Sequence, residues 1–170
     1  DLGDDLTDPF LLNPKDSYSN EQKQLSSDRV GIAKKPEINA WSGPFIMATA
    51  NTRVVRRTEA LLALRQESYG ADFTYQEHAF HKSWFSAVKS LLLTGLSVLV
   101  LLSPLKRLVK PFLPKPGEGP SESVQENGWF DCKYIVETDD GTKSVFNMNG
   151  KGDPGYKVTS KLVSECALCL

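Results

Sequence analysis

The sequence lacks the residue patterns that carry most enzyme chemistry. It has 3 cysteines and 2 histidines in 170 residues, and it contains no glycine-rich phosphate loop, no paired nucleophile and base, and no cluster of metal-ligating residues. An odd and sparse set of cysteines does not make a disulfide framework and favours a reducing compartment, so we expect an intracellular protein. The net charge of -1 argues against the strongly basic face that nucleic-acid binding needs. We therefore expect neither a nucleic-acid partner nor a bound metal.

The chain also lacks an initiator methionine, because it opens with Asp1-Leu2-Gly3. Its tail, from Val145 to Tyr156, is typical of the distal part of a larger enzyme. We therefore expect a piece of a longer enzyme, which is inactive by itself.

What is present predicts an α+β fold. We expect a long helix, a small antiparallel sheet or hairpin and a C-terminal helix, together with an apolar, membrane-associating helical segment. The expected segments are 1–40, irregular and polar; 41–83, the helix plus a strand of the α+β domain; 84–113, the apolar helical segment; 114–128, a Pro/Gly linker; and 129–170, a hairpin plus C-terminal helix of the same domain.

The long helix is predicted from its start signals and its composition. Ser42 can cap a helix, and Pro44 is tolerated in a first turn because its missing N–H has no helical partner there. The segment from Phe45 to Leu64 is rich in Ala, Leu, Arg and Glu, which are good helix formers. Apolar and polar residues then alternate from Asp72 to His78, which is typical of a strand.

The C-terminal third predicts a hairpin followed by a helix. Strand-like sequence at 129–137 and 143–148 flanks Asp139-Asp140-Gly141, a composition that favours a tight turn. Asp153 followed by Pro154 matches a helix cap and first helical residue. We therefore expect the last helix to begin at this pair.

The apolar segment 84–113 has no charged residue between Lys89 and Lys106. A spanning helix needs about 20 apolar residues, and the proline of Ser103-Pro104 ends the run early. Insertion as a monotopic helix or hairpin therefore fits as well as a full span. A buried core helix and a contact with another protein are the other interpretations. The basic residues that follow can contact anionic head groups, so we expect a membrane or lipid-droplet surface as partner.

Six polar residues are candidates for substrate binding. Arg53 and Arg57 lie one helical turn apart, so their guanidinium groups could clamp a carboxylate or phosphate; the alternative is a solvated face. A strand end and the following turn could line a cleft, although a purely structural turn is the alternative. The candidate substrate-binding residues are Asn51, Arg53, Arg57, Asn147, Asp153 and Tyr156.

Two further motifs favour structural interpretations. Cys166 and Cys169 have C-x-x-C spacing, but they lie late in a predicted helix, whereas a redox thiol is activated at a helix N-terminus. We expect them to be buried apolar residues. His78 and His81 lie three apart in a strand-like stretch, and we expect ordinary polar surface residues rather than metal ligands.

Four sequence blocks resemble the saccharopine dehydrogenase-like oxidoreductases. They occur in the order of that family and extend over nearly the whole chain, which makes them more specific together than singly. The blocks are WSGPFIMATANTRVVRR (41–57), YGADFTYQE (69–77), LPKPGEGP (113–120) and GDPGY (152–156).

This resemblance implies the rest of the function. The full proteins are similar to saccharopine reductase and to the mycobacterial trans-acting enoyl reductase of glycolipid synthesis. They have an N-terminal Rossmann domain that would bind NAD(P), and eukaryotic members associate with lipid droplets and membranes. For the full-length protein the resemblance implies NAD(P), and for this chain no cofactor site. It identifies no catalytic residue.

We therefore expect the C-terminal part of an NAD(P)-dependent oxidoreductase acting on lipids or glycolipids at a membrane or lipid-droplet surface. A mitochondrial location and a homodimer are compatible with this interpretation. The first alternative is a non-catalytic adaptor with the same fold at a membrane or lipid droplet. The second is a small soluble binding module whose apolar run is core.

Overall fold

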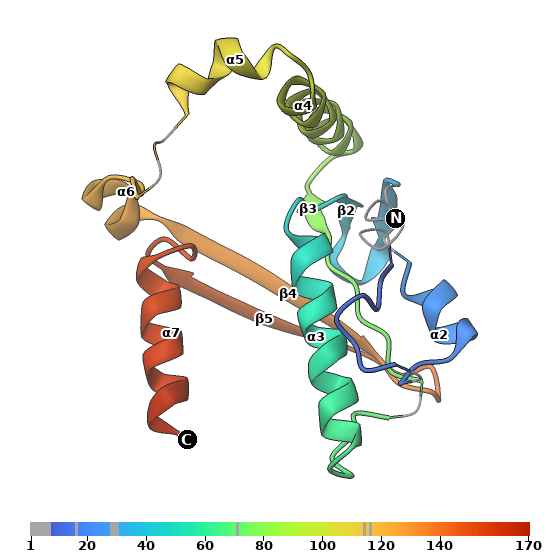
Figure 1. The fold of residues 1–170 in the computed structure, drawn as a ribbon. Coiled ribbons are helices and arrows are strands. Elements are labelled where there is room, and N and C mark those ends of the chain that lie inside the picture. The colour runs from blue at the N-terminus through green and yellow to red at the C-terminus, as the bar shows by residue number, and fades with distance from the viewer. Residues whose placement is uncertain (1–7, 16, 28–30, 71, 114, 116) are drawn as a thin grey trace. The chain divides into compact units, whose positions relative to one another are not determined.

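The computed structural model describes residues 8–15, 17–27, 31–70, 72–113, 115 and 117–170 (Figure 1). Parts of the predicted segments 1–40, 41–83 and 114–128 therefore lie outside the described residues. The chain divides into two compact units, residues 1–100 and 101–170, and each is described by itself. Helices and two small antiparallel sheets confirm the predicted α+β class.

The helices and strands follow one another in a mixed order. The first unit contains α2 (Asn20–Leu25), β1 (Ala33–Lys35), the 3-10 helix η1 (Pro36–Ile38), β2 (Ala40–Gly43), α3 (Ala48–Ala63), β3 (Ala79–His81) and most of α4 (Trp84–Leu102). The second contains α5 (Lys106–Val109), the 3-10 helix η2 (Lys110–Phe112), α6 (Glu122–Asn127), β4 (Trp129–Glu137), β5 (Lys143–Lys151) and α7 (Lys157–Leu168).

A three-stranded antiparallel sheet with the order β1-β2-β3 lies in the first unit. Its central strand, β2, includes Ser42, which pairs with Ala33 on one side and Phe80 on the other. The prediction that Ser42 caps the long helix was therefore wrong. The Ser42 hydroxyl is buried and donates to the Ala33 carbonyl oxygen at 3.2 Å. Satisfying a buried hydroxyl within the sheet is worth more than capping an exposed turn.

The long helix is confirmed as α3, but it begins at Ala48 rather than at Pro44. Its N-cap is Met47, whose side chain makes no capping hydrogen bond. The strand expected at 72–78 is displaced along the chain, since β3 comprises Ala79–His81 and pairs with Trp41–Gly43. Residues 72–78 were misread because alternation alone does not show which residues find a pairing strand.

The apolar segment forms α4, which ends at Leu102 just before Ser103-Pro104, as the sequence predicted. Short turns of helix, α5 and η2, follow. By length and composition alone α4 could cross a membrane, and only 6% of it is buried. It is therefore not a core helix within the described residues.

The predicted hairpin is confirmed as β4 and β5, which pair antiparallel from Trp129↔Lys151 to Glu137↔Lys143. The last helix, α7, begins at Lys157, later than the predicted Asp153-Pro154 start. Asp153 stabilises the preceding turn instead, since its carboxylate accepts the backbone N–H of Tyr156 at 2.8 Å. Figure 1 shows α7 following the hairpin at the end where β5 finishes.

The buried core among the described residues is small. Its apolar members are Phe10, Ala40, Ala60 and Ala87, and three of these four are alanines. Buried polar side chains are as prominent, and they cluster on α3. Because its apolar core is small, the first unit depends more on hydrogen bonds between buried polar groups than a domain with a larger core does.

Candidate functional site

One face of α3 carries buried polar side chains. Thr52, Arg53 and Arg56 are 1%, 5% and 3% exposed, and their spacing of one, three and four residues puts them on adjoining parts of the helix surface. The Thr52 hydroxyl turns back to the Ala48 carbonyl oxygen at 2.7 Å. Arg53 donates to the Thr49 carbonyl oxygen at 2.6 Å. Both side chains are thus held along their own helix.

Arg56 connects three parts of the first unit. Its Nη1 donates to the Pro9 carbonyl oxygen at 2.9 Å, and its Nη2 donates to the carbonyl oxygens of Ser26 and Tyr75 at 2.7 and 2.9 Å. The guanidinium carbon also lies 5.6 Å from the centre of the Phe10 ring, within range of a cation–π contact. These contacts attach the N-terminal segment around Pro9 and Phe10 to α3.

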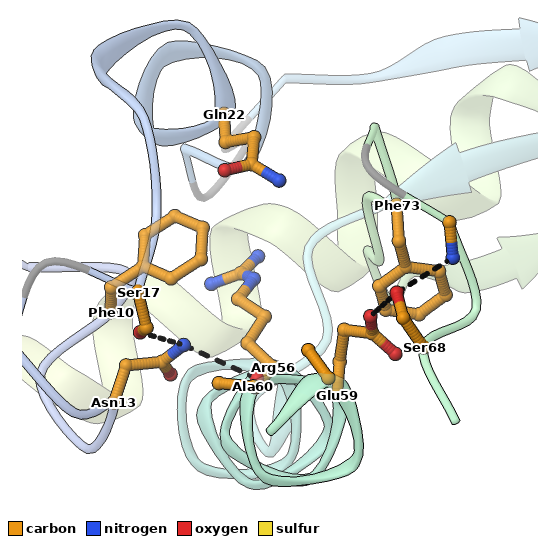
Figure 2. A pocket seen from close by; sticks show the side chains of 11 residues that line it. Phe10, Asn13, Ser17, Gln22, Arg56, Glu59, Ala60, Ser68 and Phe73 are labelled. Atoms are coloured by element: carbon orange, nitrogen blue, oxygen red, sulfur yellow. Dashed lines mark hydrogen bonds between the residues drawn. The ribbon is translucent and has the colours of Figure 1, made fainter. Parts of the chain in front are cut away.

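A pocket of about 190 Å³ lies beside Arg56 (Figure 2). In Figure 2 the guanidinium points between Phe10 and Gln22, while Glu59 points toward Ser68. The Glu59 carboxylate accepts the Ser68 hydroxyl at 2.5 Å and the Tyr69 N–H at 3.0 Å, which fixes the loop after α3. The lining residues are Phe10, Asn13, Ser17, Gln22, Arg56, Glu59, Ala60, Ala63, Ser68, Gly70 and Phe73.

The polar side chains that line this pocket hold neighbouring segments of the chain together through hydrogen bonds. Its lining includes no histidine, cysteine or lysine. The charged groups at its wall hold chain segments: Arg56 donates to backbone carbonyls, and Glu59 accepts from the loop. Asn13 adds a further link, because its amide donates to the Arg56 carbonyl oxygen at 3.2 Å. We therefore assign the pocket no reaction.

Asp8 forms an ionic contact at the edge of the same region. Its carboxylate lies 3.1 Å from the Lys23 amino group and accepts the Phe10 N–H at 3.0 Å. Partial burial raises the pKa of Asp8, but the Phe10 hydrogen bond and the charges of Lys23 and Arg53 together hold that pKa below its usual value. The carboxylate thus stays ionised and keeps the N-terminal segment on α2 and α3.

The candidate residues on α3 have contacts within the first unit. The Asn51 amide donates to the Glu77 carboxylate at 2.9 Å, and the Tyr75 hydroxyl donates to the same carboxylate at 3.0 Å. Arg53 is buried, whereas Arg57 is exposed and donates to the Leu12 carbonyl oxygen. The two guanidinium groups therefore differ in environment, and this does not favour the clamp that their spacing suggested.

The other candidates lie in the second unit. The amide oxygen of Asn147 on β5 accepts a hydrogen bond from the Lys133 amino group at 2.9 Å. Asp153 accepts the Tyr156 N–H, and the Tyr156 ring packs against Gly119 at ordinary contact distance. The six candidates are thus divided between the two units, and within each unit they form separate contacts rather than one cluster.

Sequence reasoning missed the central role of Arg56. It singled out Arg53 and Arg57 on this helix, whereas the three carbonyl partners of Arg56 lie 47, 30 and 19 residues away. No local pattern contains those separations. The spacing of three between Arg53 and Arg56 was the available signal, since it puts both on one buried face.

The cysteines and histidines provide no metal site among the residues that the structure describes. Cys166 and Cys169 are exposed and Cys132 is half-buried, so the prediction of buried cysteines was wrong for the C-x-x-C pair. His81 lies 3.4 Å from the Ser86 hydroxyl through its Nδ1. Both His78 and His81 are half-buried rather than fully exposed.

The described residues contain no Rossmann unit. Both of their sheets are antiparallel, and a Rossmann unit needs parallel strands joined through a helix, with a glycine-rich turn at the pyrophosphate. Gly128 and Gly152 lie close together in the second unit, but there the Gly152 N–H donates to the Gly128 carbonyl oxygen at 2.7 Å. These glycines close the base of the hairpin and leave no phosphate cradle.

The chain is similar to mycobacterial trans-acting enoyl reductases. It is 37% identical over 178 residues to a candidate trans-acting enoyl reductase of Mycobacterium tuberculosis, an alignment covering 97% of this chain and 41% of that protein. It is 31% identical to the trans-acting enoyl reductase of Mycobacterium leprae and 30% identical to that of Mycobacterium bovis, with the same coverage. No family model and no solved structure matches the chain.

These relatives correct the expected family. They are named trans-acting enoyl reductases, so the assignment to saccharopine dehydrogenase-like oxidoreductases was wrong. They also give no support to the expected roles at a membrane or lipid droplet, in a mitochondrion or in glycolipid synthesis. An oxidoreductase remains consistent with their names. The chain spans about two fifths of the length of these relatives.

Proposed function

We propose that this chain is part of a trans-acting enoyl reductase, an enzyme that reduces the carbon–carbon double bond next to a carbonyl group. The observation that carries this proposal is the alignment of 97% of the chain with such proteins at up to 37% identity. An alignment of this extent includes both units, so the similarity does not rest on one short motif.

In this proposal the chain contributes scaffold and substrate-side surface. The reduced dinucleotide, NAD(P)H, would supply the hydride, and sequence beyond these residues would bind it, because the described residues contain no Rossmann unit. Both strands of the hairpin carry exposed apolar side chains, including Tyr134, Val136, Val145, Phe146 and Met148. Such a surface suits contact with the remainder of an enzyme.

Substrate contact by the six candidate residues remains part of the proposal. Among those on α3, exposed Arg57 is better placed to contact a carboxylate or phosphate group of a substrate than Arg53, which is buried. In the second unit, Asn147 lies on an exposed strand and Tyr156 is 55% exposed. The upstream Rossmann domain, the homodimer and the intracellular location stay predictions.

A chimera tests the proposal. The region of the Mycobacterium tuberculosis relative that aligns with this chain would be replaced by residues 1–170, and NADPH oxidation would be followed with an enoyl thioester as substrate. We expect activity that depends on the enoyl substrate. A chimera that folds, binds NADPH and shows no substrate-dependent oxidation would contradict the proposal.

Two controls separate function from folding. The relative itself gives the reference rate, and the 170-residue chain alone is expected to give none. Within the chimera, Arg57→Ala should raise KM for the acyl substrate while leaving NADPH binding unchanged. Lys161→Ala, a removal of a positive charge from exposed sequence on α7, should change neither quantity.

A further inference from the structure

The helix α4 exposes apolar side chains on two sides. Leu92, Leu96, Leu99 and Leu102 are 66%, 57%, 64% and 80% exposed, and Val98 and Leu101 are also exposed. Successive residues of an α-helix are separated by about 100°. Positions 92, 96 and 99 therefore lie on one side, and positions 98 and 101 lie on the other.

This distribution favours a lipid environment over a single protein contact. The side opposite Leu92, Leu96 and Leu99 carries the hydroxyls of Ser86, Ser90, Thr94 and Ser97, but after Lys89 α4 has no charged residue on any side. The Ser97 hydroxyl donates to the Leu93 carbonyl oxygen at 2.8 Å, so it is satisfied within the helix. A helix with no charged face is typical of a large core or of lipid. Within the described residues α4 is not in a core, because only 6% of it is buried.

The charges on both sides of α4 have one sign. From residue 78 to residue 117 the sequence contains no Asp or Glu, in a chain whose net charge is -1. The positive charges of this stretch precede, flank and follow the apolar run: Lys82, Lys89, Lys106, Arg107, Lys110 and Lys115. Such charges complement the anionic head groups of a phospholipid surface.

The length of the charge-free helix indicates how deeply it inserts. Within α4 the residues after Lys89 run from Ser90 to Leu102, which is about 20 Å at 1.5 Å per residue. The hydrocarbon core of a bilayer is about 30 Å thick. The helix then breaks at Pro104, and α5 and η2 expose Leu108 and Phe112 beside basic residues. That alternation is typical of a segment lying in the head-group region.

We propose that residues 84–113 insert into one leaflet of an anionic phospholipid bilayer, with both ends of the segment on the same side. The apolar helix α4 enters the hydrocarbon, and the basic residues of α5 and η2 lie among the head groups. This inference is independent of the enoyl reductase proposal, because it rests on the exposure and charge of the segment alone.

Vesicle flotation tests the binding. The 170-residue chain should float with vesicles of phosphatidylcholine and phosphatidylserine and much less with pure phosphatidylcholine. The triple variant K106Q/R107Q/K110Q should lower the partition coefficient on the order of 100-fold at low salt, since each basic residue near the surface is worth about a factor of five. The matched control K34Q/K151Q/K161Q removes as many exposed positive charges elsewhere and should bind normally.

A second pair of variants tests the apolar contact. Leu96→Asp puts a charge in the middle of α4 and should lower vesicle binding at least about 100-fold. Leu162→Asp makes the same change on α7, where Leu162 is 54% exposed, and should leave binding unchanged. Equal losses for the two substitutions, or binding that ignores lipid charge, would overturn the proposal.

Thiol labelling tests the insertion on one side. With the chain added to preformed vesicles, a membrane-impermeant maleimide should label exposed Cys166 and Cys169, which follow the segment. In a cysteine-free background it should also label Glu67→Cys, which precedes it. Protection of either site until detergent is added would mean a full span and would overturn the proposal. So would flotation by the chain alone but not by the chimera, because the helix would then be covered by protein.

Discussion

The Nη1 atom of Arg56 donates to the carbonyl oxygen of Pro9 at 2.9 Å, across 47 residues of sequence. This contact joins the N-terminal segment to the middle of α3. With its two other carbonyl acceptors, at Ser26 and Tyr75, Arg56 determines how the first unit closes around a small core.

Replacing Arg56 by methionine should destabilise the first unit strongly. The substitution keeps an apolar stem but leaves three carbonyl groups without this donor, and we expect a loss of about 3 kcal/mol in the free energy of unfolding. Urea denaturation followed by far-UV circular dichroism measures it. Arg57→Met, which removes one exposed hydrogen bond, is the control and should cost less than about 1 kcal/mol. Equal costs would show that Arg56 has no special role.

Asp8 should make the stability of the first unit depend on pH. Its pKa is lowered in the folded chain, so the folded state binds this proton more weakly than the unfolded state does. The stabilisation is therefore complete above the unfolded pKa of about 3.9. It is lost as the pH falls through the lower, folded value.

The comparison of the native chain with Asp8→Asn measures this effect. The native chain should be the more stable of the two at pH 7, and the difference should shrink as the pH falls below about 4. The Asp8→Asn variant keeps the shape of the side chain. A difference in stability that stays constant over this range would contradict the lowered pKa.

Glu59 should hold the loop that follows α3. Its carboxylate accepts hydrogen bonds from Ser68 and Tyr69, and Glu59→Ala should cost about 1 to 2 kcal/mol locally. Amide hydrogen exchange in residues 66–70 should become faster. Glu67→Ala, at an exposed neighbouring position, should leave exchange there unchanged.

Gly128 should tolerate no larger side chain. A Cβ atom at this position would lie 2.8 Å from the backbone nitrogen of Asp153, and backbone atoms there cannot move aside easily. Gly128→Ala should destabilise the second unit by about 2 kcal/mol through overpacking. At Gly119 the nearest atom is the Tyr156 ring at 3.6 Å, so Gly119→Ala should have a much smaller effect. Thermal unfolding of both variants makes the comparison.

Local patterns predicted the elements that form from local sequence. The hairpin of β4 and β5 was predicted because its turn, Asp139-Asp140-Gly141, and both strands are contiguous. The end of α4 was predicted because a proline breaks a helix whatever surrounds it. The register of β4 and β5 then follows from the short connection between them.

Elements that depend on distant partners were misplaced. Serine is a common helix cap, so Ser42 was predicted to cap α3. Instead it lies in β2, where it pairs with Ala33 and Phe80. The strand at 72–78 failed for the same reason, since β2 pairs with residues 79–81. Asp153 kept its role as a hydrogen-bond acceptor but stabilises a turn before α7.

The candidate site was predicted less well than the fold. The residue types suggested that the side chains of Arg53, Arg57 and Asn51 bind a ligand. In the structure all three instead make hydrogen bonds to other groups of the chain. The same donors suit either purpose, and only the positions of the acceptors decide between them. The family was misassigned although the matched blocks lie in sequence shared with enoyl reductases, because shared blocks do not by themselves separate one oxidoreductase group from another.

Whether the chain is part of an enoyl reductase is decided by the rate of NADPH oxidation by the chimera, measured with and without an enoyl thioester. We expect a substrate-dependent rate within about tenfold of the Mycobacterium tuberculosis relative, which corresponds to about 1.4 kcal/mol in the activation barrier. A folded chimera that binds NADPH but oxidises it at the same background rate with and without the enoyl substrate would contradict the claim.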